Sequence, residues 1–174
     1  AWRAGKLRDV RFTETRPWLQ GARLTAWELA AAKVPATLMT ESAAGGQAVR
    51  GEIDWLIVGA DRIAANGDVV NKVGTAPLAA LTRLGGGRVM VVAPFSTVDL
   101  TLVRGGEVVI EERVGEEVWR GTQARDVPVG IAIANPVFDV TPAQQVDCLV
   151  TERGLIYPVE GEHPGRLEVG SMIK

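Results

Sequence analysis

Short runs of apolar and β-branched residues alternate along this chain with segments of helical periodicity, and this alternation constrains the fold most strongly. Strands alternating with helices are typical of βα units and of a parallel sheet. The pattern predicts an α/β fold: a Rossmann-like open, mostly parallel sheet with helices on both faces, built by residues 1–174 as a single domain. We expect the strands at Val10 to Thr13, Ala36 to Thr40, Trp55 to Ala60, Arg88 to Ala93, Val108 to Glu111, Gly130 to Ala134 and Leu155 to Pro158.

The first predicted helix runs from Leu19 to Lys33. Leu24, Trp27 and Ala31 fall on one stripe of it, which we expect to face the core. The proline that follows at position 35 disfavours a helical residue before it, so the helix is expected to end there.

Two further helices are predicted from their end signals. One has Thr75 as its N-cap and stops at Gly85 to Gly87. The other begins with T-P-A-Q, where Thr141 and Gln144 form a capping box, and ends at Gly154.

Charge and cysteine content limit the partners of the chain. The 19 basic and 21 acidic residues give a net charge of -2, without the basic excess of nucleic-acid-binding proteins, so we expect no DNA or RNA partner. Cys148, alone in the sequence and expected inside the third helix as a buried thiol, cannot form an internal disulfide. We expect no metal site, because no Cys/His cluster has ligand spacing, and a reducing, cytoplasmic setting. The apolar runs are far shorter than the roughly 20 residues of a membrane helix, so no membrane span is expected.

The most informative motif is I-V-G-A-D-R-I-A-A-N-G-D-V-V-N-K-V-G-T, which covers residues 57–75. Asp61 directly follows an apolar strand, and Asn71 and Lys72 precede the start of a helix. In open α/β sheets, ligands bind at the carboxyl ends of strands and the amino ends of the helices that follow. The Lys72 ammonium, free N–H groups around Gly74 and Thr75 and the helix dipole are therefore expected to hold a phosphate.

An ordinary loop explains the same residues equally well. Asp61 and Asp68 can be turn residues, Asn66 and Gly67 a tight turn, and Lys72 a solvated surface charge. The segment has neither the Walker pattern nor the dinucleotide fingerprint, so the spacing alone indicates an anion site and no more.

A second junction between strand and helix lies in T-E-T-R-P-W-L-Q-G-A-R-L. Gly21 permits close approach of the backbone at the start of the helix. Two interpretations stay open for each polar residue here: Arg16 pairs with a carboxylate such as Glu14 or faces a ligand, and Gln20 caps the helix or donates its amide to a sugar hydroxyl.

Several long motifs, in this order, resemble those of the S-methyl-5-thioribose-1-phosphate isomerase family of methionine salvage. They are E-T-R-P-x-L-Q-G-A-R-L-T-A-W-E-L, V-G-A-D-R-I-A-A-N-G-D-V-x-N-K-x-G-T, A-P-x-S-T-x-D-L, I-E-E-R and N-P-x-F-D-V-T-P, between Glu14 and Pro142. The wider family includes ribose-1,5-bisphosphate isomerase and the regulatory subunits of the exchange factor for the eukaryotic tRNA-delivering initiation factor.

The resemblance implies an aldose-ketose isomerase, an intramolecular oxidoreductase that converts S-methyl-5-thioribose 1-phosphate into S-methyl-5-thioribulose 1-phosphate without nicotinamide or metal. It makes Asp61 the catalytic carboxylate and places Gln20, Asn71 and Lys72 against the sugar phosphate. Members of the family generally pair as dimers, so a homodimer is implied.

The resemblance also implies that this chain is the carboxy-terminal half of a longer protein, as does its start at Ala1 without a methionine. The family's catalytic cysteine, in a C-N-x-G type motif, and the phosphate-binding arginines belong to an amino-terminal helical half that is absent here. Cys148 is not expected to substitute for that cysteine, so the isolated chain is expected to be inactive. Thr40 to Ala43 reads T-E-S-A where T-D-S-M is common in the family.

Three other functions remain open. The regulatory subunits share the scaffold without catalysis, but they typically carry another residue at the position of Asp61. Ribose-1,5-bisphosphate isomerase is the enzymatic alternative, and L-Q-G-A-R-L-T-A-W-E-L favours the methylthioribose enzyme over it. A nucleotide-binding domain would need a glycine fingerprint after its first strand, which the sequence lacks.

Overall fold

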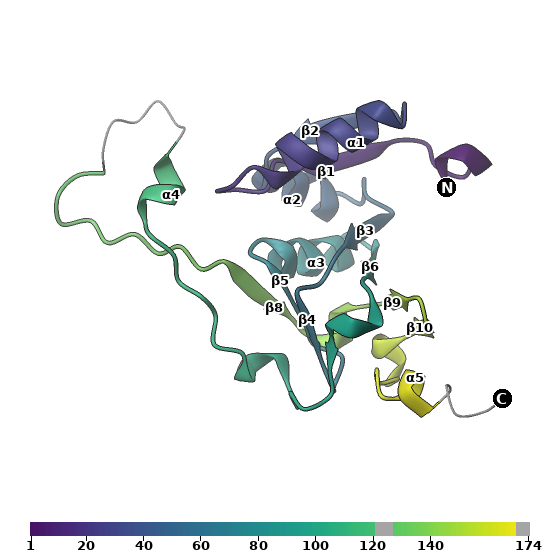
Figure 1. Ribbon diagram of the computed structural model, residues 1–174. Helices are drawn as coiled ribbons and strands as arrows, with labels where there is room; N and C mark the ends of the chain where they lie inside the picture. The colour runs from purple at the N-terminus through teal and green to yellow at the C-terminus, as the bar shows by residue number, and fades with distance from the viewer. Residues whose placement is uncertain (121–126, 170–174) are drawn as a thin grey trace. The chain divides into compact units, whose positions relative to one another are not determined.

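The computed structural model describes residues 1–120 and 127–169 (Figure 1). The chain divides into two compact units. Unit 1 comprises Ala1–Gly46 and Arg113–Asn135, and unit 2 comprises Gln47–Glu112 and Pro136–Lys174. Among the described residues, no helix combines the length and the apolar character needed to cross a membrane.

Unit 1 contains a parallel pair of strands and the helix between them. Its elements are η1 (Trp2–Ala4), β1 (Val10–Thr13), the π-helical turn η2 (Gly21–Thr25), α1 (Ala26–Ala31), β2 (Ala36–Met39) and α4 (Glu116–Trp119), and α2 (Glu41–Val49) begins in it. The two predicted strands are confirmed, and the first predicted helix is confirmed as η2 continuing into α1.

The predicted core stripe of this helix is wrong. Leu24 and Trp27 are 62% and 70% exposed, and Ala31 is exposed as well. The reason is Gly21, which packs so closely on β1 that a Cβ atom there would lie 1.8 Å from the carbonyl oxygen of Thr13. This contact fixes the rotation of the helix and turns the three apolar side chains away from the strands.

Unit 2 contains two four-stranded sheets. Its elements are β3 (Trp55–Val58), β4 (Arg62–Ala64), β5 (Val69–Lys72), α3 (Thr75–Leu84), β6 (Arg88–Val92), η3 (Phe95–Thr97), β7 (Val98–Asp99), η4 (Gly105–Glu107), β8 (Phe138–Thr141), η5 (Ala143–Gln145), β9 (Cys148–Thr151), β10 (Gly154–Ile156), η6 (Pro158–Glu160) and α5 (Arg166–Val169). The first sheet has the order β10-β9-β6-β3, with β3, β6 and β9 parallel, and the second has the order β7-β4-β5-β8. Parallel pairings outnumber antiparallel ones among the named strands, which confirms the predicted α/β class.

One apolar cluster draws side chains from both sheets of unit 2. Ile63 and Val69 come from the second sheet, and Val91, Leu149 and Ile156 come from the first. All of them are at most 1% exposed. The helix α3 packs against β3 and β6 on one side and β8 on the other (Figure 1), so its start is fixed relative to both sheets.

The prediction of a third helix is wrong. Thr141 ends β8, T-P-A-Q begins only the single turn η5, and Cys148 starts β9, although its predicted burial is confirmed. A short apolar run cannot be assigned to a helix or a strand by periodicity alone. Here β6 pairs with the run C-L-V-T in parallel, with Met90 opposite Cys148, and this tertiary pairing decides for the strand.

Two predicted strands, at residues 108–111 and 130–134, are also wrong. Val109 is 94% exposed, and the segment joins no strand of either sheet, although the Glu111 carbonyl oxygen accepts the N–H of Val137. Ile131 is likewise exposed. β-Branched residues favour strands only where a neighbouring strand and a core receive them.

Candidate functional site

The carboxyl ends of three parallel strands meet at one edge of the first sheet of unit 2. β3 ends at Val58, β6 at Val92 and β9 at Thr151, and they are neighbours in the order β9-β6-β3. Because ligands bind at this edge in α/β folds, the loops that follow these strands are the first place to look for a site.

An open pocket of about 540 Å³ lies at this edge. Asp61 and Arg62, which follow β3, form one side of it, and Phe95 to Thr101, which follow β6, form the other. The predicted catalytic carboxylate and the motif A-P-F-S-T-V-D-L therefore line the same pocket. Ser96 and Thr97, two hydroxyl-bearing residues of this motif, are among the lining residues.

Asp61 lies where the chain passes from the first sheet into the second. Its backbone N–H donates to the carbonyl oxygen of Val70 at 2.9 Å. Val70 is already the partner of Arg62 in the register of β4 and β5, so this bond places Asp61 in a bulge at the start of β4 and not in the ladder. The Asp61 side chain is exposed, because β3 ends before Gly59 and the carboxylate lies beyond the sheet.

The loop after β9 supports the Phe95 side of the pocket. The Glu152 carboxylate accepts the backbone N–H of Phe95 at 2.8 Å, and the Arg153 guanidinium lies 3.9 Å from the centroid of the Phe95 ring. The hydrogen bond from the Phe95 N–H lowers the pKa of Glu152 below its ordinary value. Thus the ends of β6 and β9 are tied together beside the pocket.

An ion pair between Asp99 and Arg62 connects the two sides of the pocket. Asp99 accepts the Thr101 hydroxyl at 2.6 Å and the Thr101 backbone N–H at 3.1 Å, and its carboxylate lies 3.8 Å from the Arg62 guanidinium. The hydrogen bond from the Thr101 hydroxyl is the main reason that the pKa of Asp99 is lowered. This carboxylate is thus engaged in shaping the loop.

Asn71 and Lys72 are held in the turn between β5 and α3. The Asn71 amide donates to the Thr75 hydroxyl at 3.0 Å, and that hydroxyl donates to the carbonyl oxygen of Lys72 at 2.7 Å. The Lys72 ammonium lies 5.4 Å from the centroid of the Phe138 ring. Gly74, at φ 104°, is the N-cap of α3, so the predicted N-cap at Thr75 is wrong by one residue.

The N–H groups at the start of α3 are occupied by a carboxylate that the sequence analysis missed. Asp139 accepts the N–H of Gly74 at 2.7 Å and that of Ala76 at 3.1 Å. The expectation of a free N–H at Gly74 is therefore wrong. Burial raises the pKa of Asp139 above its ordinary value, although the N–H groups of Ala76 and Gly74 act in the opposite direction.

The loop explanation is correct for the tip of the β4–β5 hairpin. Asn66 accepts the N–H of Asp68 at 3.0 Å, and Gly67 has φ 88°. The Asp68 carboxylate accepts the N–H groups of Gly105 and Ala143 at 3.1 and 2.9 Å, so it is a structural tie between loops.

Gln20 belongs to unit 1, where it precedes η2 in helical conformation without a side-chain capping bond. Its Oε1 atom is buried and has no hydrogen-bond partner among the described residues. The capping interpretation of Gln20 is therefore wrong. Thr15 and Leu19, just before it, have φ of 63° and 58°. Such left-handed, non-glycine residues are uncommon and cluster at ligand sites.

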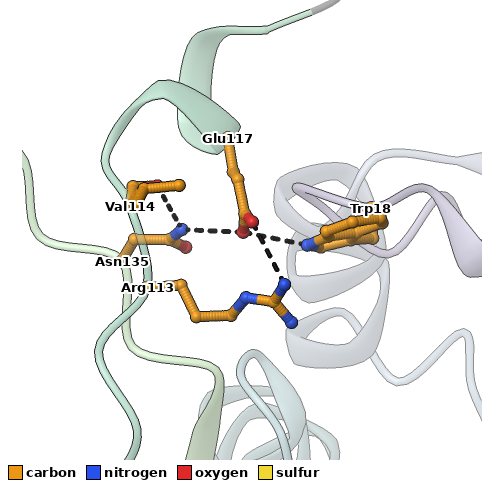
Figure 2. A network of polar contacts seen from close by, with 5 residues as sticks. All are labelled: Trp18, Arg113, Val114, Glu117 and Asn135. Atoms are coloured by element: carbon orange, nitrogen blue, oxygen red, sulfur yellow. Dashed lines mark hydrogen bonds and ion pairs between the residues drawn. The ribbon is translucent and has the colours of Figure 1, made fainter.

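A polar network fixes the turn that carries Gln20 (Figure 2). The Trp18 indole N–H and the Asn135 amide donate to the Glu117 carboxylate at 2.9 and 3.2 Å, and the Arg113 guanidinium lies 3.2 Å from it. Desolvation alone would raise the pKa of Glu117, but these hydrogen bonds and the Arg113 charge together lower it. Arg16 donates to the carbonyl oxygen of Val118, in place of the expected partner Glu14.

Asn71, Lys72 and Gly74 thus lie together at the turn between β5 and α3, Asp61 lies after β3 beside the pocket, and Gln20 lies in unit 1. Asp139 lies in the motif F-D-V-T-P, but nothing local to that motif indicates that its carboxylate contacts the start of α3. Among residues 1–120 and 127–169, no group of His, Cys, Asp or Glu side chains gathers as metal ligands.

Comparison with known proteins gives close relatives. Methylthioribose-1-phosphate isomerase of Alkalilimnicola ehrlichii is 54% identical over 157 residues, which are 90% of this chain and 45% of that protein. The crystal structure of 5-methylthioribose 1-phosphate isomerase from Pyrococcus horikoshii OT3 matches with a TM-score of 0.90 and 40% identity, over 97% of this chain and 47% of that one.

A second crystal structure, that of the translation initiation factor eIF-2B, subunit delta, from A. fulgidus, matches with a TM-score of 0.86 and 39% identity. It is matched over 97% of this chain and 49% of that one. The chain therefore spans about half the length of the relatives it matches. The model of the initiation factor 2 subunit family matches residues 1–158, so the chain belongs to that family.

Proposed function

We propose that the chain forms the carboxy-terminal part of an aldose-ketose isomerase that converts S-methyl-5-thioribose 1-phosphate into S-methyl-5-thioribulose 1-phosphate. The observation that carries the proposal is Asp61, an exposed carboxylate that lines a pocket at the carboxyl edge of the parallel strands. The names of the two isomerases that are 54% and 40% identical to the chain support the same reaction.

The reaction requires ring opening of a furanose that carries phosphate on its anomeric carbon, followed by transfer of hydrogen from C2 to C1. C1 is reduced as C2 is oxidised, so no external oxidant or reductant takes part. Asp61 acts as the general acid and base that moves a proton between the ring oxygen and the chain oxygens. Its exposure to the pocket gives a substrate oxygen access to the carboxylate.

The other predicted residues bind the sugar phosphate. Lys72 supplies a positive charge next to Asn71, whose amide faces the start of α3. Gly74 contributes through its φ of 104°, which turns the chain between these side chains and α3. Gln20 contacts a sugar hydroxyl, and the buried Oε1 without a partner among the described residues supports a ligand there.

We further propose that residues 1–174 form one domain of a cytoplasmic homodimer, completed by an amino-terminal half that supplies the second catalytic residue, a cysteine. The coverage of about 45% of the isomerase of Alkalilimnicola ehrlichii supports a further half.

Asp61→Asn in the complete protein tests the role of the carboxylate. We expect turnover of S-methyl-5-thioribose 1-phosphate to fall at least about a hundredfold, the usual effect of losing an acid/base group. The rate at which the ketose product forms measures this turnover. Asp54→Asn is the matched control, because Asp54 is an equally exposed carboxylate at the amino end of the same strand, β3. Near-normal turnover of Asp61→Asn would remove this residue from the mechanism.

A regulatory role in initiation-factor exchange is the second candidate, favoured by the match to the eIF-2B subunit delta structure. The same assay separates the candidates. Turnover of the methylthioribose substrate by the wild-type protein supports the isomerase, turnover of ribose 1,5-bisphosphate alone supports the related enzyme, and the absence of both leaves the regulatory role.

A further inference from the structure

The strand β8 lies directly beside β5, the strand that ends in Asn71 and Lys72 (Figure 1). The antiparallel register pairs Asn71 with Asp139 and Lys72 with Phe138. Side chains of directly opposed residues in an antiparallel pair lie on the same face of the sheet and contact each other. The two residues proposed to bind substrate therefore each have one neighbour on β8.

Three successive residues of this segment contact the turn after β5. The carbonyl oxygen of Val137 accepts the N–H of Val73 at 2.9 Å. The ring of Phe138 lies 5.4 Å from the Lys72 ammonium. The carboxylate of Asp139 accepts two N–H groups at the start of α3. Together they determine where the turn leaves the sheet and where the Lys72 side chain lies.

The Asp139 carboxylate occupies the place that a bound phosphate takes at the start of many helices. Both of its oxygens are engaged, one by the Gly74 N–H and one by the Ala76 N–H. A phosphate in the same place would have to displace this carboxylate and would meet its negative charge. The start of α3 is therefore filled by the protein itself.

We propose that Asp139 and Phe138 are positioning residues of the substrate site: Asp139 fixes the turn that carries Asn71 and Lys72, and Phe138 holds the Lys72 ammonium toward the phosphate. The inference rests on the proposed function and adds that the phosphate contacts the Lys72 side chain and not the N–H groups of α3. Neither β8 residue touches the reacting atoms.

Asp139→Asn in the complete protein tests the inference, with Asp68→Asn as the matched control. The Asp68 carboxylate also accepts two backbone N–H groups in unit 2, but it ties loops at the opposite end of the β4–β5 hairpin. Both variants lose one charge-assisted acceptor, so a merely structural effect is common to them. An effect on substrate positioning is specific to Asp139.

Hydrogen exchange and kinetics are the two measurements. We expect Asp139→Asn to speed amide exchange in residues 73–77 and to lower kcat/KM at least about tenfold, since small displacements of positioning groups are costly in rate. Asp68→Asn is expected to leave both within about threefold of wild type while lowering the melting temperature. Equal losses of kcat/KM in the two variants, or unchanged exchange at residues 73–77 in Asp139→Asn, would overturn the inference.

A second variant covers the case in which Asp139→Asn does not fold. Phe138→Leu retains an apolar side chain and removes the ring beneath Lys72, and we expect KM to rise at least about fivefold with kcat changed less, because a cation–π contact is worth about 1 kcal/mol. An unchanged KM contradicts the proposal. If the wild-type protein has no isomerase activity, the proposed function fails, and exchange at residues 73–77 alone decides whether Asp139 fixes the turn.

Discussion

The single thiol of the chain shows how burial separates a structural residue from a catalytic one. Cys148 is 7% exposed and pairs with Met90 on the central strand β6. Desolvation, with a contribution from the neighbouring Asp147 charge, raises the pKa of this thiol. Because the thiolate is the reactive form, both effects suppress its chemistry.

We therefore expect Cys148 to react with a thiol reagent at pH 8 about a hundredfold slower in the folded chain than after unfolding in guanidinium. Ala80→Cys in a Cys148→Ala background is the control, because Ala80 is exposed on α3. Release of the chromophore from a disulfide reagent measures both rates. Equal rates for Cys148 and the exposed control cysteine in folded protein would contradict the prediction.

At the scale of single residues, the sequence identified the polar groups next to apolar strands and missed those that depend on pairing across the fold. Asp61, Asn71 and Lys72 are adjacent to a strand end or a helix start, which local patterns reveal. Asp139 is 63 residues from Ala76 along the chain, and only the register of β8 against β5 brings them together. No local pattern contains that register.

Among the elements, the contact between η2 and β1 has little tolerance for change. A Cβ atom at Gly21 would lie 1.8 Å from the Thr13 carbonyl oxygen and 2.8 Å from the Thr15 hydroxyl oxygen. The first of these atoms belongs to the backbone and cannot rotate away. The strand, the helix start and the Gln20 side chain that precedes it must therefore shift if this residue gains a methyl group.

The substitution Gly21→Ala is expected to lower the free energy of unfolding by at least about 1–3 kcal/mol, the usual cost of forcing an extra methyl group into a rigid contact. Urea unfolding followed by tryptophan fluorescence measures the loss as a lower midpoint. Gly106→Ala is the control, because a Cβ atom at Gly106 meets nothing within 4 Å. Equal midpoints for the two variants would show that the contact at Gly21 is not tight.

Elements with their own end signals were predictable, and elements defined by partners were not. The helix α3 is predicted from the cap signal at its start and the glycines at its end. By contrast, β9 and the predicted third helix share the same apolar run, and pairing with β6 decided between them. The strands β4 and β5 lie in a segment predicted as a loop, and among their features only the Asn66–Gly67 turn between them is anticipated, as part of the loop alternative.

At the scale of the whole molecule, unit 1 stands out for its lack of a buried apolar core. Every buried hydrophobic side chain among the described residues belongs to unit 2, whereas Trp18, Leu24, Trp27 and Leu38 in unit 1 are exposed. Exposed apolar groups of this size usually mark surfaces that another protein segment covers. The chain spans about half the length of each relative that it matches.

The proposed reaction needs a second acid/base group, and Cys148 lies too far from the pocket to provide it. Cys148 begins β9, whereas the pocket lies where the parallel strands end, and β9 ends three residues later at Thr151. At about 3.3 Å per residue this is about 10 Å, too far for direct proton transfer to a substrate beside Asp61.

We therefore expect the 174-residue chain alone to convert S-methyl-5-thioribose 1-phosphate at less than about a thousandth of the rate of the complete protein, in line with the loss of an acid/base group. Proton NMR of the ketose product measures both rates, and Cys148→Ala in the complete protein, expected to retain full activity, is the control. Substantial turnover by the isolated chain would show that residues 1–174 contain every group the reaction requires.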